Sequence, residues 1–392
     1  MNITNKIEII AGPCSVESRE QVLATAKALS ALGIKLFRAG VWKPRSHPSD
    51  FEGVGVVALE WLKEVKEKFS MDIAVEVARE EHVSRTLASG ITTFWLGSRT
   101  TSNPFAVQEI ADTIASYIEE RKRKEKGKRE EKGRENERGE WKEEESLQSP
   151  LKVYIKNPLS PDIELWSGAV ERILLSGVKM KDIALIHRGF TSYDRSIYRN
   201  APMWNIAIQM HKRYPQLPLI CDPSHIAGDR KYVQQIAQQA LNLSFDGLMV
   251  EVHNNPSIAK SDSLQQLLPE EFAQMLENLN VKASSQKDKV SPKIGKEESM
   301  ELLREEIDLI DSKILSLLSE RMEVSKYIGE YKREKDMPLY QDERYNSMIA
   351  KRGEEGDKKG LSKTFVKRVM DLIHSESLEN QIKNTINESK KN

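Results

Sequence analysis

The sequence has little cysteine, no excess of charge of either sign and no long apolar run. Cys14 and Cys221 are the two cysteines among 392 residues, too few for a disulfide framework. Lysine and arginine number 60, as do aspartate and glutamate, so no global charge attracts nucleic acid or anionic lipid. No stretch approaches the roughly 20 apolar residues of a membrane span, and the first residues lack the features of a secretory signal. We therefore expect a cytoplasmic protein that binds neither nucleic acid nor membranes.

Short apolar runs alternate with amphipathic stretches from residue 6 to about residue 280, which is typical of βα units around a parallel sheet. The predicted strands span residues 7–11, 34–39, 72–77, 91–96, 152–156, 183–187, 217–221 and 247–252. Eight such units favour a closed (β/α)8, or TIM, barrel. An open Rossmann-type sheet is disfavoured, because the turn after the first strand reads Gly12-Pro13-Cys14-Ser15 and is not rich in glycine.

Two polar segments interrupt or end this pattern. Residues 120–150 are almost entirely Lys, Arg, Glu and Gly. We expect this charged insertion to be a solvated loop or a fraying helix, with an arm that docks on a partner as the alternative. Residues 281–297 are polar and predict a linker, which separates a barrel domain at 1–280 from a second domain at 298–392.

The second domain shows helical periodicity. Apolar residues repeat at helical spacing from residue 297 to about residue 335 and predict one long helix, which Pro338 ends. Two further helices, near 342–352 and 362–380, complete a small all-α three-helix domain. Such a domain is too small to bury its long helix well, so we expect it to dimerise and the protein to be a homodimer or a dimer of dimers.

Polar side chains follow the predicted strands, at the end of a barrel where catalytic residues lie. Six of them are cations and indicate a substrate rich in phosphate or carboxylate: Arg38, Lys43, Arg45, Arg99, Lys156 and Arg188. Four others combine S, N and O donors, as a divalent transition metal ion accepts: Cys14, His225, Glu251 and Asp262. Mn²⁺ is the ion we favour, with Fe, Co and Zn as alternatives. A single histidine or cysteine is more often structural, so the joint placement carries this prediction.

The motifs at these strand ends resemble those of type I 3-deoxy-D-arabino-heptulosonate 7-phosphate (DAHP) synthase, in its beta subgroup. They are AGPCSVE at 11–17, RAG at 38–40, KPRS at 43–46, GSRTT at 97–101, KN at 156–157, DPSH at 222–225, and Glu251 through Asp262. The resemblance implies that phosphoenolpyruvate condenses with erythrose 4-phosphate, and that Cys14, His225, Glu251 and Asp262 bind the metal. It also implies that phosphoenolpyruvate is held by Arg99, Lys156 and Arg188, with Arg38 and Lys43 close by. Erythrose 4-phosphate would then meet Lys43, Pro44, Arg45 and Ser46.

In the implied mechanism the metal would act as a Lewis acid on the aldehyde oxygen, while the cations place both anions within reacting distance. Lys43 is our choice for proton transfer, with Glu76 as the second candidate. The sequence departs from the family at Ser46, where Thr is usual, and at His187, where an acidic residue is more common. The sister 3-deoxy-octulosonate 8-phosphate synthase is the alternative, but its second-strand loop usually reads Lys-Ala-Asn-Arg-Ser, unlike residues 43–46 here.

Polar residues on the predicted helices of the second domain suggest a further site. Lys332 lies eleven residues after Arg321, about 16 Å along the axis and only about 20° around it, so the two can share a site. Arg304 points about 100° away from Arg321, so a partner chain would have to supply it. Ser377 and Gln381 stand at i, i+4 on one face of the last helix.

The order and spacing of these residues resemble the all-helical chorismate mutase family. The matching positions are 303–308, 317–321, Lys332, Arg344, Ser377 and Gln381. The resemblance implies rearrangement of chorismate to prephenate. The carboxylates would be bound by Arg304 of one protomer with Arg321 and Arg344 of the other, and the ether oxygen by Lys332 and Gln381.

The mutase resemblance has two departures. Gln341 stands where an acidic residue is common, and Tyr345 where the family usually has Glu. Two alternatives to a catalytic domain therefore stay open. One is a sensor that binds chorismate or prephenate and allosterically inhibits the barrel, and the other is a module that only dimerises.

Overall fold

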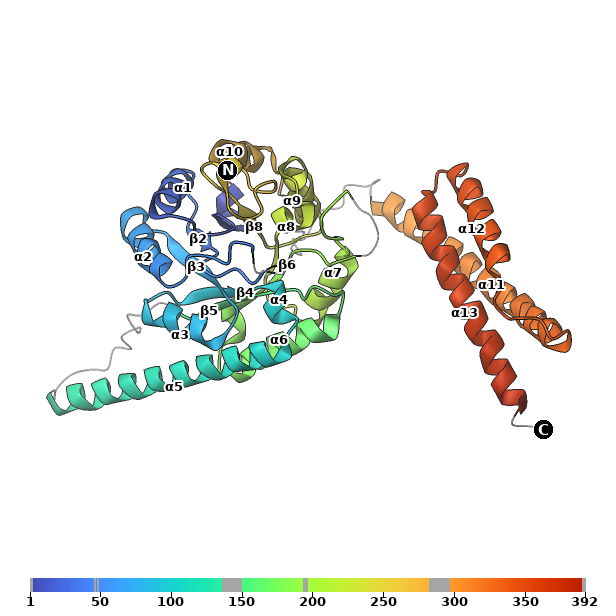
Figure 1. The fold of residues 1–392 in the computed structure, drawn as a ribbon, viewed down its shortest axis with the longest axis horizontal. Helices are drawn as coiled ribbons and strands as arrows, with labels where there is room; N and C mark the ends of the chain where they lie inside the picture. Colours follow the sequence, from blue (N-terminus) through green and yellow to red (C-terminus); the bar gives the residue numbers. More distant parts are fainter. Residues whose placement is uncertain are drawn as a thin grey trace. The chain divides into compact units, whose positions relative to one another are not determined.

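In a computed structural model the chain forms two compact units, Met1–Gln286 and Lys287–Asn392 (Figure 1). The structure describes residues 3–45, 47, 49–135, 150–192, 197–281 and 297–389. Ser46 and nearly all of the predicted linker at 281–297 lie outside the described residues.

The first unit is a closed barrel of eight parallel strands, each paired with the next, with β8 paired to β1 (Figure 1). The strands are β1 (Glu8–Gly12), β2 (Leu36–Ala39), β3 (Asp72–Val77), β4 (Thr93–Leu96), β5 (Lys152–Lys156), β6 (Ile183–His187), β7 (Leu219–Cys221) and β8 (Gly247–Glu251). The predicted (β/α)8 fold is confirmed. Strands β2, β4 and β7 begin two residues later than predicted. Ile34, Ile91 and Leu217 extended the apolar pattern because they are buried in the core just before these strands begin.

Helices surround the barrel. They are α1 (Arg19–Ala31), α2 (Val57–Phe69), α3 (Glu80–Ala88), α4 (Ser98–Thr101), α5 (Pro104–Glu135), α6 (Ile163–Leu175), α7 (Trp204–Arg213), α8 (Pro223–Ala227), α9 (Val233–Asn242) and α10 (Pro269–Asn278). Short 3-10 turns span Ile3–Asn5, Met180–Asp182, Arg230–Tyr232 and Pro256–Ile258.

Two apolar layers form the core of the barrel unit. The larger one lies between the sheet and the helices, and includes Phe37, Val75 and Phe94. The smaller one includes Leu36 and Trp95, strand residues adjacent in sequence to outward members such as Phe37 and Phe94. Because successive strand residues point to opposite faces, this second layer fills the barrel interior. The chemistry is therefore confined to the ends of the strands.

Helix α5 includes the first part of the predicted charged insertion. Ile110 and Ile114 are buried against the barrel unit, whereas the side chains around residues 119–124 are largely exposed. Two ion pairs at i, i+4 join Glu119 to Arg123 at 3.5 Å and Glu120 to Lys124 at 2.6 Å. Residues 120–135 are thus helical, which agrees with the helical form of the prediction, and residues 136–149 lie outside the described residues.

The second unit consists of α11 (Glu297–Glu334), α12 (Asp342–Asp357) and α13 (Lys363–Ser389), and α13 packs on both other helices (Figure 1). The predicted all-α three-helix domain is confirmed. One stripe of α11 is 47–63% exposed and consists of Ile307, Ile310, Ile314, Leu317, Val324 and Ile328. Their spacing of three, four or seven residues puts them on one face. Among the described residues of both units, no helix combines the length and apolar character that crossing a bilayer requires.

Candidate active sites of the barrel and the helical domain

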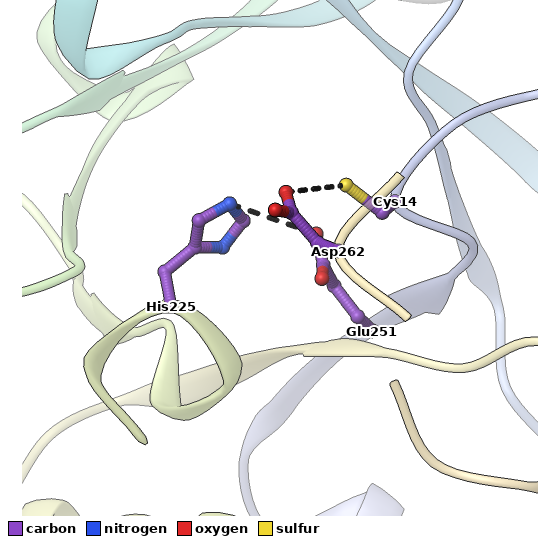
Figure 2. Close-up of side chains that lie close together, drawn as sticks. All are labelled: Cys14, His225, Glu251 and Asp262. Atoms are coloured by element: carbon purple, nitrogen blue, oxygen red, sulfur yellow. Dashed lines mark hydrogen bonds and ion pairs between the residues drawn. The ribbon is translucent and has the colours of Figure 1, made fainter. Parts of the chain in front are cut away.

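Four side chains meet above the C-terminal ends of the barrel strands (Figure 2). Cys14 follows β1, His225 lies in α8 after β7, Glu251 ends β8, and Asp262 lies in the loop after β8. One N, O or S atom from each lies within 4.8 Å of the others. Cys14 Sγ is 3.2 Å from Asp262 Oδ2, and His225 Nε2 is 3.7 Å from Glu251 Oε1. The structure brings together all four residues predicted as metal ligands.

The donor set fits a divalent transition metal ion. Burial raises the pKa of the Cys14 thiol well above its usual value, and the Glu251 and Asp262 carboxylates add to this effect. Burial also lowers the pKa of His225, so the imidazole is in the neutral form that binds metals. A bound cation would offset the repulsion between the two carboxylates and favour the thiolate.

Buried partners hold these side chains in place. Both oxygens of Glu251 accept hydrogen bonds, from Arg38 Nη2 at 3.0 Å and from Gln265 Nε2 at 2.7 Å. His225 Nδ1 lies 2.8 Å from Asp222 Oδ2, which leaves Nε2 facing Glu251. Such outer partners orient metal ligands. Gln265 could not be singled out from the sequence, because a buried glutamine has no sequence signal apart from its position near Asp262.

Several of the predicted cations lie beside this cluster and are paired with carboxylates. Lys156 Nζ lies 2.6 Å from Asp222 Oδ2, and Lys43 Nζ lies 3.3 Å from Glu76 Oε2. The guanidinium of Arg38 lies 5.2 Å from the centre of the Trp95 ring. Burial opposes the charge of Lys43, but Cys14, Glu76 and Glu251 outweigh it and raise the pKa. Burial lowers the pKa of Lys156, despite its contact with Asp222.

The remaining predicted cations differ in exposure. Arg188 is buried and donates from Nη1 to Asn200 Oδ1 at 2.9 Å, and burial lowers its pKa to about 10. Arg45 Nη1 lies 3.7 Å from Asp262 Oδ2, which brings the second-strand loop to the predicted metal site. Arg99 lies in α4 and is exposed.

A cavity of about 310 Å³ opens among the loops after β2, β3 and β4. Lys43, Pro44 and Arg99 line it, together with Arg79 and the stacked rings of Trp42 and His82, whose centroids are 4.2 Å apart. Arg79, Trp42 and His82 were not predicted from the sequence, although they follow β2 and β3 as the predicted residues do. Burial and the charge of Arg79 lower the pKa of His82 to about 4, so the imidazole is neutral.

His187, the unusual residue of β6, packs among aromatic rings. It is fully buried, and its ring lies 5.3–6.1 Å from those of Phe190, Trp204 and Phe245. Burial lowers its pKa to about 4. We therefore assign His187 a packing role next to Arg188. A neutral imidazole surrounded by rings supplies no charge to the mouth of the barrel, where the predicted cations lie.

In the helical domain, some of the residues predicted for the mutase site form hydrogen bonds between or beside the helices. Arg321 Nη1 donates to Ser377 Oγ at 2.6 Å, and Gln381 Nε2 donates to Ser325 Oγ at 2.9 Å. Lys332 Nζ donates to the Leu339 carbonyl oxygen at 2.6 Å. Arg304 and Arg344 are exposed, and no contact described for this part of the chain joins either of them to this group.

Comparison with known families identifies both units of the chain. Residues 4–116 and 143–285 match the model of the DAHP synthetase I family. The chain belongs to the DAHP synthetase I family. Residues 303–382 match the model of chorismate mutase type II, so the helical unit is a chorismate mutase domain. Residues 117–142 match neither model, and they overlap the charged insertion.

Three relatives illustrate the similarity. The phospho-2-dehydro-3-deoxyheptonate aldolase of Thermotoga maritima is 29% identical over 271 residues, which cover 69% of this chain and 68% of that protein. A crystal structure of the DAHP synthase of Thermotoga maritima has a TM-score of 0.54 at 28% identity, and the match covers 69% of this chain and 67% of that one. The T-protein of Haemophilus influenzae is 31% identical over 84 residues, which are 21% of this chain and 22% of that protein.

These findings establish a bifunctional enzyme of the shikimate pathway. The barrel is a DAHP synthase, which condenses phosphoenolpyruvate with erythrose 4-phosphate. The helical domain is a chorismate mutase, which converts chorismate to prephenate.

Proposed function

We propose that the barrel carries out its condensation at the cationic mouth beside a divalent ion, Mn²⁺ in our assignment, held by Cys14, His225, Glu251 and Asp262. The observation that carries this proposal is the convergence of four donor atoms within 4.8 Å, next to buried cations. When bound, the ion supplies a Lewis acid for the aldehyde oxygen of erythrose 4-phosphate.

The cations of the mouth hold phosphoenolpyruvate. Arg99, Lys156 and Arg188 come from the ends of three successive strands, with Arg38 and Lys43 close by. Most of these cations are buried, so little water screens their attraction for an anion. Pro44, Arg45 and Ser46 meet the second substrate. The enol carbon then attacks the aldehyde, water adds to the resulting cationic carbon, and inorganic phosphate leaves.

Lys43 is the proposed proton donor. Its Nζ is 3.3 Å from Glu76, and nearby negative groups raise its pKa, so it carries a proton at neutral pH. This proton would pass from Nζ to the oxygen that was the aldehyde oxygen, and Glu76 would keep the lysine oriented.

The mutase site takes residues from two chains. Arg321 and Arg344 of one protomer and Arg304 of the other bind the two carboxylates of chorismate, while Lys332 and Gln381 stabilise the ether oxygen. The exposed apolar stripe on α11 supports a homodimer, or a dimer of dimers, because dimerisation would bury that stripe. We further propose a cytoplasmic location, which the similarity to bacterial metabolic enzymes supports.

Assays of the purified full chain test both assignments. Phosphoenolpyruvate consumption should require erythrose 4-phosphate and stop with EDTA, and chorismate loss should continue with EDTA. Consumption with arabinose 5-phosphate alone would instead identify a 3-deoxy-octulosonate 8-phosphate synthase.

A second role for the helical domain is a sensor that inhibits the barrel when chorismate or prephenate is bound. Gln341 and Tyr345 support this role, because they replace the acidic residues that are usual in the mutase family. The test is prephenate inhibition of the barrel in Arg321→Ala. Inhibition that persists without this arginine would count against a sensor at the mutase site.

A further inference from the structure

The loop after β8 carries Asp262 away from the strand and then returns to it at Leu267. The Leu267 N–H donates to the Glu251 carbonyl oxygen at 2.9 Å, and the Leu267 carbonyl oxygen accepts from the His253 N–H at 3.0 Å. These two bonds form a parallel bridge that extends the sheet beyond β8. Gln266, the residue before Leu267, is therefore held at a fixed place beside the end of β8.

Gln266 connects this fixed place to the segments that carry two other predicted metal ligands. Its side chain is fully buried. Gln266 Oε1 accepts a hydrogen bond from the Cys14 N–H at 2.9 Å, and Nε2 donates to the Ser261 carbonyl oxygen at 2.8 Å. Ser261 directly precedes Asp262. One glutamine thus joins the backbones of two ligand segments that are far apart in the chain, and both bonds go to backbone atoms.

Two buried serines make a second link between the same segments. The Oγ atoms of Ser15 and Ser261 lie 2.5 Å apart. Glu17 Oε1 accepts hydrogen bonds from the Ser15 hydroxyl at 3.1 Å and from the Lys260 N–H at 2.8 Å. We call the four residues that make these links the loop clasp: Gln266, Ser15, Ser261 and Glu17. The loop clasp fastens the loop after β8 to the loop after β1.

Asp262 needs such support for two reasons. Its backbone has a φ of 46°, in the left-handed region, which is unfavourable for a residue with a side chain unless the surroundings fix it. Its carboxylate also attracts two arginines, with Arg199 Nη1 at 2.9 Å from Oδ1 and Arg45 Nη1 at 3.7 Å from Oδ2. Without the loop clasp, these arginines would draw Asp262 away from Cys14, whose Sγ lies 3.2 Å from Oδ2 (Figure 2).

We propose that the loop clasp, and Gln266 above all, positions Cys14 and Asp262 for one ion and thereby determines the affinity of the metal site. The inference rests on the proposed metal site. Gln266 is a positioning residue, because it acts through the backbones of the ligand segments. Its role differs from that of Gln265, whose side chain donates directly to the carboxylate of Glu251.

Calorimetric titration of the full-length protein with Mn²⁺ tests the proposal. Gln266→Met keeps the length of the side chain but removes both hydrogen bonds, and it should raise Kd about 10–100-fold. Ser261→Ala removes only the contact with Ser15 and should raise Kd about 3–10-fold, the effect of one neutral hydrogen bond. Gln235→Met, the same substitution at an exposed position of α9, should bind Mn²⁺ as the wild type does.

Co²⁺ distinguishes positioning of the ligands from general stabilisation of the fold. A thiolate bound to Co²⁺ gives a charge-transfer absorption, so this band reports the contact between Cys14 and the ion. At saturating Co²⁺ the band should be weaker in Gln266→Met than in the wild type, and Cys14→Ala should lack it. The free energy of unfolding, measured for each variant in EDTA, shows separately what each substitution costs the fold without metal.

The outcomes separate this inference from the metal assignment. If Gln266→Met is less stable in EDTA but has the Mn²⁺ Kd and the Co²⁺ band of the wild type, the loop clasp only supports the fold and the proposal is overturned. If Gln266→Met does not fold, Ser261→Ala decides, and an unchanged Kd overturns the proposal. If the wild type itself binds neither ion, the proposed metal site fails, and this inference fails with it.

Discussion

The barrel and the helical domain both present cations for anionic substrates. In the barrel most of these cations are buried and paired within one chain, whereas in the helical domain two of them are exposed. In the barrel, Arg38 and Lys156 are 0% and 4% exposed and lie beside carboxylates of the same chain. In the helical domain, Arg304 and Arg344 are exposed. A closed sheet gathers eight strand ends around one axis, so a single chain can complete the site. Three helices enclose less, and the site that we propose for the second domain therefore includes Arg304 of a partner chain.

Removal of the metal should separate the two domains most clearly. EDTA should lower the barrel activity by at least about 10³-fold, because a Lewis acid supplies several kcal/mol of transition-state stabilisation. Chorismate loss in the same sample should be unchanged. Restoration by added Mn²⁺, measured as phosphoenolpyruvate consumption, is the control. Barrel activity that resists EDTA would contradict the assignment of a catalytic metal to Cys14, His225, Glu251 and Asp262.

The converse change is Arg321→Ala. Chorismate turnover should fall about 10²–10³-fold, the typical cost of one lost charge-stabilising donor. Phosphoenolpyruvate consumption should stay within about twofold of the wild type. Lys326→Ala, an exposed change on the same helix, is the matched control for chorismate loss. Equal effects of the two substitutions would argue against a ligand role for Arg321.

Acid should destabilise the barrel through His187. Its pKa is about 4 in the folded protein and 6.5 without the fold, so the unfolded chain binds more protons as pH falls from 6.5 to 4. Stability is therefore lost across this window, by up to about 3 kcal/mol. His187→Leu should flatten this part of the urea-unfolding profile measured against pH. Phe190→Leu, which changes a ring beside His187 without removing a titratable group, should keep the slope.

The outer partners of the metal ligands should have a smaller effect. Gln265→Ala removes the hydrogen bond to Glu251 Oε2 and should weaken Mn²⁺ binding about 10–100-fold. Calorimetric titration of the metal measures this without an activity assay. Gln235→Ala, an exposed change on α9, should bind Mn²⁺ as the wild type does.

The smallest effect should come from the charged insertion. Replacing residues 121–149 with a short Gly/Ser linker should leave both kcat values within about twofold, because surface loops tolerate changes of length. Ile110 and Ile114, which are buried at the base of α5, stay in place. A large loss of either activity would favour the alternative in which the insertion docks on a partner.

Much of the barrel could be predicted, because the repeat of apolar runs and the polar residues after each run are local features of the sequence. Apolar runs marked all eight strands, and the polar residues after them included Cys14, His225, Glu251 and Asp262. The remaining site residues depend on contacts between distant segments. Trp95 lies beneath Arg38 only because β2 and β4 face the same interior, and Gln265 reaches Glu251 only through the turn of the last loop.

In the helical domain, too, the sequence predicted some features and left others to the tertiary structure. Helical spacing alone placed Ser377 and Gln381 on one face and separated Arg304 from Arg321. It could not show that Tyr345 of α12 bonds to Asp371 of α13, because that contact joins two helices at one point along their lengths. The sequence by itself determined the elements, the charges and the families. The tertiary structure decided which charges neutralise one another, because the fold sets burial and the distances between side chains far apart in the chain.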